Sequence, residues 1–142
     1  AITATACECD PEEEIKQAMA DRANYSRNHQ QLADGFYARA RYDDAERCYR
    51  RAVEQDTTNA PAHFGLGMVY LKTGRFDEAR TSFQKAVEID RRMVTGYVEI
   101  GLTHYCEGDF TRAQKQWEAA LKIDPEHKYA KALLKSLPEV DA

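Results

Sequence analysis

The chain has 142 residues and a formal net charge of −4, from 20 basic and 24 acidic residues. This acidic balance disfavours nucleic acid as a partner, because surfaces that bind nucleic acid are basic. No apolar run approaches the roughly 20 residues that a helix needs to cross a bilayer, which predicts a soluble protein without a membrane span. The length predicts one domain.

The first ten residues, AITATACECD, contain neither the basic nor the apolar region of a signal peptide. We expect residues 1–10 to form a mobile arm. A cytoplasmic location is slightly favoured, and a periplasmic one stays open if a leader was removed before Ala1.

An Asp-Pro pair followed by three glutamates, at residues 10–14, predicts the start of a helix. It offers a capping aspartate, a proline in the first turn and acids at the positive end of the helix dipole. This N-terminal helix is predicted over residues 11–25, with Ile15, Ala18 and Met19 facing inward.

The rest of the chain has the three-and-four spacing of apolar residues that is typical of amphipathic helices. Pro125 separates a last helix, predicted to run from about Glu126 to Ser136. Before it, the pattern predicts helices near 26–39, 43–55, 60–72, 77–89, 94–106 and 111–123.

The pattern also repeats with a fixed period, and the small and aromatic positions keep their character in each copy. Leu66 corresponds to Leu32 and Ile100, Gly67 to Ala33 and Gly101, Ala79 to Ala45 and Ala113, and Phe83 to Tyr49 and Trp117. Ala18 precedes Ala52 by the same period, so the N-terminal helix is either a cap, which we favour, or the second half of a missing repeat.

This period, with these residue types, resembles the tetratricopeptide repeat family, whose repeat is two antiparallel helices. The resemblance implies an all-α fold: an α-solenoid of antiparallel helix pairs in a right-handed superhelix, with N-terminal and C-terminal capping helices. Its three repeats would occupy 26–59, 60–93 and 94–127, and the capping helix and tail 128–142. Lys135 stands where the third repeat has Gly101, so we expect nothing to pack closely over the last helix.

The cysteines and histidines fit packing better than chemistry. Cys7 and Cys9 form a C-x-C pair with no second pair at zinc-finger spacing. Cys48 and Cys106 are interpreted as half-buried packing residues, and His29, His63 and His104 as inward-facing, neutral histidines. No catalytic motif is present, so we expect neither enzymatic activity, nor a metal, nor a cofactor.

A second apolar stripe marks the candidate site. In the tetratricopeptide family the first helices of the repeats line a concave surface where ligand peptides bind, and the resemblance places this stripe there. Gly65 would leave a dent in that groove. The stripe comprises Phe64, Met68 and Leu71 of the second repeat and Val98, Leu102 and Tyr105 of the third, with Gln30, Asp34 and Tyr37 from the first repeat and Glu99 adding polar groups.

Some members of the family bind acidic chaperone C-terminal tails through a clamp of lysine, asparagine and arginine. In this chain no cation stands at the matching places, and two acids would repel a carboxylate. The sequence therefore predicts that the chain is not a carboxylate-clamp binder of chaperone tails. The matching places hold Gln30, Asp34, Gly65, Thr95 and Glu99.

These observations predict a non-catalytic adaptor, scaffold or assembly factor. Its partner would be a protein that offers an amphipathic helix or an extended apolar segment to the groove. Two alternatives stay open: a metal- or redox-linked protein that uses Cys7 and Cys9, and a structural homo-oligomer joined through the same stripe.

Overall fold

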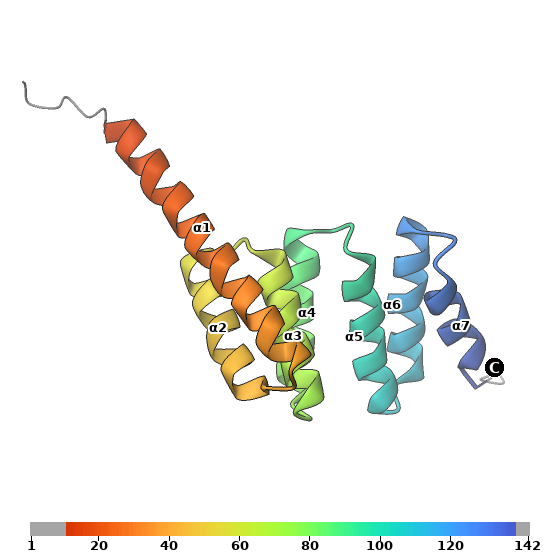
Figure 1. Ribbon diagram of the computed structural model, residues 1–142. Coiled ribbons are helices and arrows are strands. Elements are labelled where there is room, and N and C mark those ends of the chain that lie inside the picture. Colours follow the sequence, from red (N-terminus) through yellow and green to blue (C-terminus); the bar gives the residue numbers. More distant parts are fainter. Residues whose placement is uncertain (1–10, 139–142) are drawn as a thin grey trace, which may run out of the picture.

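The computed structural model describes residues 11–138, and within this range the chain forms seven helices and no strand (Figure 1). None of these helices is both long enough and apolar enough to cross a membrane. Their bounds are α1 Pro11–Ala38, α2 Tyr42–Gln55, α3 Ala60–Lys72, α4 Phe76–Ile89, α5 Val94–Cys106, α6 Phe110–Ile123 and α7 Lys128–Ser136.

Local chemistry sets the helix boundaries. The side chain of Asn59 accepts a hydrogen bond from the backbone N–H of Ala62 at 3.0 Å, which caps α3. The turns that close the second and third pairs place Gly74 and Gly108 at φ values of 76° and 81°, a conformation that favours glycine. Ala40 takes the same left-handed conformation in the first pair, at φ 58°.

Within each of the last two pairs, a small residue on one helix receives an aromatic ring from the other. A Cβ atom added to Gly67 on α3 would lie 2.6 Å from the Phe83 ring of α4. A Cβ atom on Gly101 of α5 would lie 2.3 Å from Trp117 Nε1 of α6. Phe83 and Trp117 are fully buried, so these contacts form the centre of the core, as the repeat pattern predicts.

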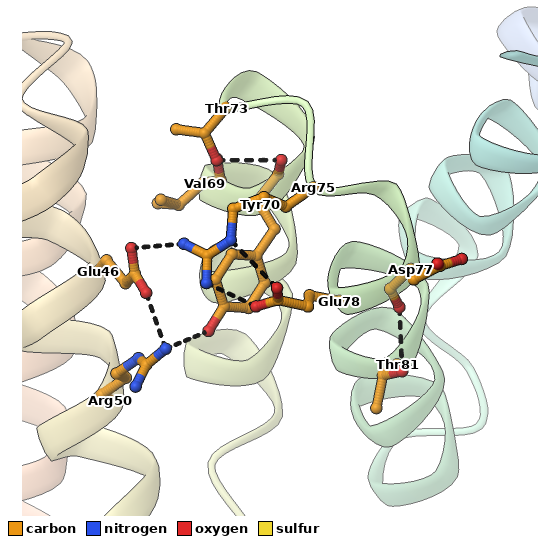
Figure 2. A network of polar contacts seen from close by, with 9 residues as sticks. All are labelled: Glu46, Arg50, Val69, Tyr70, Thr73, Arg75, Asp77, Glu78 and Thr81. Atoms are coloured by element: carbon orange, nitrogen blue, oxygen red, sulfur yellow. Dashed lines mark hydrogen bonds and ion pairs between the residues drawn. The ribbon is translucent and has the colours of Figure 1, made fainter.

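A polar network joins the first pair to the second on the side of α3 that faces α2 and α4 (Figure 2). Arg75 lies in the turn between α3 and α4, and its guanidinium bridges Glu46 of α2 at 3.0 Å and Glu78 of α4 at 2.6 Å. The same guanidinium carbon lies 4.3 Å from the centre of the Tyr70 ring. Arg50 of α2 donates a hydrogen bond to the Tyr70 hydroxyl at 3.2 Å.

The first helix differs from the prediction. The sequence predicts two helices separated near Ser26, whereas α1 is a single helix of 28 residues. No glycine or proline interrupts residues 20–30, so nothing stops helix propagation there. Ser26 is buried inside this helix, where its hydroxyl donates a hydrogen bond to the Ala52 carbonyl at 2.7 Å.

The N-terminal part of α1 projects away from the helix pairs (Figure 1). The prediction that Ile15, Ala18 and Met19 face inward is wrong, because all three are exposed, Ile15 at 61% and Met19 at 65%. Leu32 is also 50% exposed, although its repeat equivalent Leu66 is buried. No helix pair precedes α1 within residues 11–138, so these apolar side chains have no neighbour there to cover them.

At the other end, α7 packs against the third pair. Ala130 is fully buried with Val98 and Ala120, and Leu133 is half-buried against them. Lys135 is exposed. This short helix therefore covers the last pair on one side and presents lysine to solvent on the other.

Candidate functional site

A hollow of about 370 Å³ lies between α1, α3 and α5, the first helices of the three pairs. Most of its lining is apolar or aromatic, and its polar groups come from α1, α2 and α5. The lining residues are Gln30, Asp34, Tyr37, Tyr49, Pro61, Phe64, Gly65, Met68, Met93 and Thr95.

Tyr49 reaches this hollow from α2 because Gly65 has no side chain. A Cβ atom on Gly65 would lie 2.3 Å from the Tyr49 ring, so the glycine makes room for that ring. The expected dent at Gly65 is therefore occupied. The Tyr49 hydroxyl donates a hydrogen bond to Asp34, and Gln30 Nε2 donates another to the same carboxylate at 3.3 Å.

Packing against neighbouring aromatic rings holds two side chains of the hollow in place. The ring centroid of Phe64 lies 5.4 Å from that of Phe83, and the Tyr37 centroid lies 5.6 Å from that of Tyr42. Both arrangements are tilted or edge-on, which aromatic quadrupoles favour. Met68 is half-buried on the same wall, and its flexible thioether can adapt to the shape of a ligand.

The electrostatics of the hollow link the three first helices. Burial raises the pKa of Glu99 on α5 above the ordinary value for a carboxyl group, and the Lys72 charge on α3 partly opposes this rise. Burial also raises the pKa of Tyr37 on α1, with further contributions from Tyr42 and from the Glu99 charge. Asp34 in the lining and Glu99 outside it are the acids of this surface, and Lys72 is a cation that acts on Glu99.

The structure brings together half of the predicted site residues. Val98 is in the wrong place for ligand contact, because it is 3% exposed under α7 and its carbonyl accepts a hydrogen bond from Trp117. Leu71, Glu99 and Leu102 are half-buried outside the lining. Tyr105 is 38% exposed and packs on Phe110 and Trp117. The predicted residues that line the hollow are Gln30, Asp34, Tyr37, Phe64 and Met68.

The sequence pattern does not predict Tyr49, Pro61 and Met93 in this lining, and it indicates Thr95 only as a position of the clamp. Tyr49 follows the repeat pattern of the core, which by itself indicates a core residue. The sequence feature that indicates a ring from another helix at this place is Gly65, because the equivalent positions in the first and third repeats hold Gln31 and Glu99. A glycine found in one repeat only indicates a side chain from another helix passing over it.

A second hollow, of about 360 Å³, lies on the other side of α3, toward α2 and α4. His63 lines it, and its Nε2 lies 3.1 Å from the Thr57 carbonyl oxygen. Burial lowers the pKa of His63 and likewise that of His104. Both histidines are buried, as predicted.

The thiols separate into three cases. Cys48 is half-buried, and burial raises the pKa of its thiol. Cys106 is exposed, so its interpretation as a half-buried packing residue is wrong. Cys7 and Cys9 lie outside the described residues, and a metal or redox role for them stays a prediction. Within residues 11–138, no group of three or more histidine, cysteine or acidic side chains is arranged to hold a metal ion.

Family models identify the repeats. One tetratricopeptide repeat model matches residues 31–93 and a second matches residues 94–127. The chain belongs to the tetratricopeptide repeat family. Among curated proteins, none matches the sequence significantly.

Solved structures of tetratricopeptide repeat (TPR) domains share the architecture. The first TPR domain of Spaghetti (RPAP3), bound to the HSP90 peptide SRMEEVD, has a TM-score of 0.77 at 19% identity, covering 80% of this chain and 90% of that one. The Arabidopsis OM64 TPR domain has a TM-score of 0.77 at 22% identity, covering 80% and 94%. The second TPR domain of human RPAP3, in complex with the HSP70 peptide SGPTIEEVD, has a TM-score of 0.73 at 24% identity, covering 82% and 95%.

These structures correct one prediction. Because no clamp cation stands at the matching positions, the sequence predicts that acidic chaperone tails are not partners. TPR domains that share this fold hold peptides ending in EEVD, so that prediction is wrong. The family and fold support a protein–protein interaction module, and TPR proteins are generally non-catalytic.

Proposed function

We propose that the chain is a peptide-binding adaptor whose ligand is an extended segment of a protein partner, anchored by one apolar side chain in the hollow between α1, α3 and α5. The observation that carries this proposal is the composition of that hollow: Phe64, Met68 and Met93 form an apolar wall within about 370 Å³. Sites of this kind bind through a few apolar anchors, with polar groups that fix orientation.

The polar groups at the hollow suit an extended peptide backbone. Gln30 and Thr95 can hydrogen-bond to backbone groups, and they lie on α1 and α5, on either side of the apolar wall. Tyr49 holds Asp34 in place through its hydroxyl, which preorganises this carboxylate and lowers the cost of ordering it on binding. The peptides bound to the similar domains contain methionine or isoleucine ahead of their acidic ends, which is compatible with an apolar anchor.

The experiment is peptide display against the wild-type chain, with SRMEEVD and SGPTIEEVD titrated in parallel by calorimetry. Peptides that bind should share methionine, isoleucine, leucine or valine at one position, and alanine at that position should weaken binding. Burying such a side chain contributes about 1.5–3 kcal/mol, which corresponds to roughly 10- to 150-fold in Kd.

Two variants with the same change in charge locate the site. Met68→Glu introduces a carboxylate into the apolar wall and should weaken binding of the selected peptides by at least about tenfold. Gln84→Glu changes an exposed residue of α4 and should leave binding unchanged. Equal binding by both variants, or peptide-induced NMR shifts confined to the His63 side of α3, would contradict the proposal.

A further inference from the structure

The N-terminal part of α1 is a helical surface that no other described helix covers. We call residues 11–22 the α1 extension. Each residue in it is exposed, and its apolar side chains Ile15 and Met19 are one helical turn apart on one face. Together these two side chains form a small apolar patch on the projecting helix.

The α1 extension is acidic. Four acids outnumber two bases in it, and the three consecutive glutamates lie in the first turn of the helix. Within this segment Lys16 pairs with Glu13 at 3.2 Å. The charged residues are Glu12, Glu13, Glu14 and Asp21 against Lys16 and Arg22.

Helix α7, at the opposite end of the stack, is itself basic. Helix α7 carries Lys128, Lys131 and Lys135 and contains no acid. Tyr129 on the same helix is 53% exposed, so this end also offers apolar surface. In Figure 1 the α1 extension and α7 lie at the two ends of the stack, so an interaction between them within one chain is excluded by distance.

The repeat register relates both segments to helices of the stack. Ile15, Ala18 and Met19 lie one repeat period before Tyr49, Ala52 and Val53 of α2, so the α1 extension has the apolar pattern of a second helix. Helix α7 starts one repeat period after the start of α5, and thus has the place of a first helix. Stacked repeats bury such apolar faces against a neighbouring helix, whereas within residues 11–138 the α1 extension stays exposed.

We propose that two copies of the chain associate head to tail, the α1 extension of one copy docking on α7 of the next. The acidic residues of the α1 extension would face the lysines of α7, with Ile15 and Met19 beside Tyr129. Lys135 has the repeat position of Gly101, whose missing side chain lets the Trp117 ring pack closely in the third pair. A lysine at this position prevents such close packing, so the proposed contact is less tightly packed and more electrostatic than the contact between two helices of one pair. Because the two surfaces differ, the association is heterologous and continues into longer assemblies unless it closes into a ring.

Charge reversal at each end tests this arrangement. One variant carries Glu14→Lys and Asp21→Lys, the other Lys128→Glu and Lys135→Glu. Lys131 is left unchanged because it pairs with Glu126 at 3.1 Å. Each variant alone then has like charges at both ends, whereas an equimolar mixture restores opposite charges at the junctions between unlike variants. The measurement is sedimentation velocity over a range of concentrations, with circular dichroism confirming that the helices persist.

The wild type should associate at low salt and dissociate as the ionic strength rises to about 0.5 M, where charges are screened over a few ångströms. Each variant alone should associate at least about tenfold more weakly, and the mixture should recover association. A wild type that stays monomeric at low salt at every concentration overturns the proposal. So does association that both variants retain, or that the mixture fails to restore. Because the hollow between α1, α3 and α5 takes no part in this contact, these outcomes are independent of the peptide-binding experiment.

Discussion

The helix pairs α3–α4 and α5–α6 and the α1 extension have similar helical patterns but opposite packing. In the pairs, Phe83 and Trp117 are fully buried against glycines of the partner helix. In the α1 extension, Ile15 and Met19 are more than half exposed. The apolar pattern therefore determines which face of a helix can be buried, while the neighbouring element determines whether it is buried.

Trp117→Ala should give the largest loss of stability. The side chain is fully buried, and its indole N–H donates to the Val98 carbonyl at 3.1 Å. Truncation creates a cavity between α5 and α6 and leaves that carbonyl without its partner, at a cost of about 3–5 kcal/mol. Urea unfolding, monitored by circular dichroism, measures this loss of unfolding free energy. Trp117→Phe keeps most of the packing and should cost less; equal losses for both variants would show that burial of the ring contributes less to stability than the indole hydrogen bond.

Two glycine-to-alanine changes should have opposite signs. At Gly67 a Cβ atom would lie 2.6 Å from the Phe83 ring, so Gly67→Ala should destabilise by about 1–3 kcal/mol through overpacking. At Gly35 no atom lies within 4 Å of the added Cβ, so Gly35→Ala on α1 should stabilise by about 0.5–1 kcal/mol through helix propensity. Thermal unfolding of both variants measures the contrast. Two changes of the same sign would contradict the close approach of α3 and α4.

A third test uses pH. Burial lowers the pKa of His63, while the Thr57 carbonyl opposes the shift and Lys85 adds to it. The unfolded chain therefore binds more protons than the folded chain below pH about 6.5, the ordinary histidine value. Stability from the neutral imidazole is present above that pH and is lost as the pH falls toward the lower folded-state pKa.

Replacing His63 with glutamine should flatten the fall in stability as the pH decreases below about 6.5, by at most about 1.4 kcal/mol per pH unit. Chemical unfolding at several pH values gives the two curves. Parallel curves for the wild type and His63→Gln would mean that this histidine is protonated equally in both states.

Much of the fold could be predicted from the sequence because each repeat supplies its own signals. The bounds of α3 and α5 match their predicted ranges, 60–72 and 94–106. The continuity of α1 could not be predicted from the repeat pattern, which indicates a boundary near Ser26, although no residue there stops a helix. The inward face assigned to Ile15 presupposed a neighbour that residues 11–138 do not supply.

The candidate site was half predictable, for a related physical reason. Phe64 and Met68 were found because α3 has apolar residues on two faces, and both line the hollow. Val98 has the same repeat position as Phe64, yet α7 covers it, and a repeat pattern does not say where the last helix lies. Tyr49 enters from α2 only because Gly65 leaves room, which is a contact between helices and not a property of either helix alone.

The smallest effect is expected in the α1 extension. Ile15→Gln and Met19→Gln remove apolar side chains that are 61% and 65% exposed, so little burial is lost on unfolding. Each should change the free energy of unfolding by less than about 0.5 kcal/mol, whereas a buried aliphatic residue would cost several times more. The measurement is made on dilute protein at high salt, where head-to-tail association is suppressed and only the folding of the single chain contributes.

Under the same conditions, backbone amides of residues 11–22 should exchange with solvent faster than those of α3, because no packing opposes opening of the extension. A loss above about 1 kcal/mol, twice the limit expected for an exposed site, or equal protection of the two segments, would mean that Ile15 and Met19 are covered within the chain.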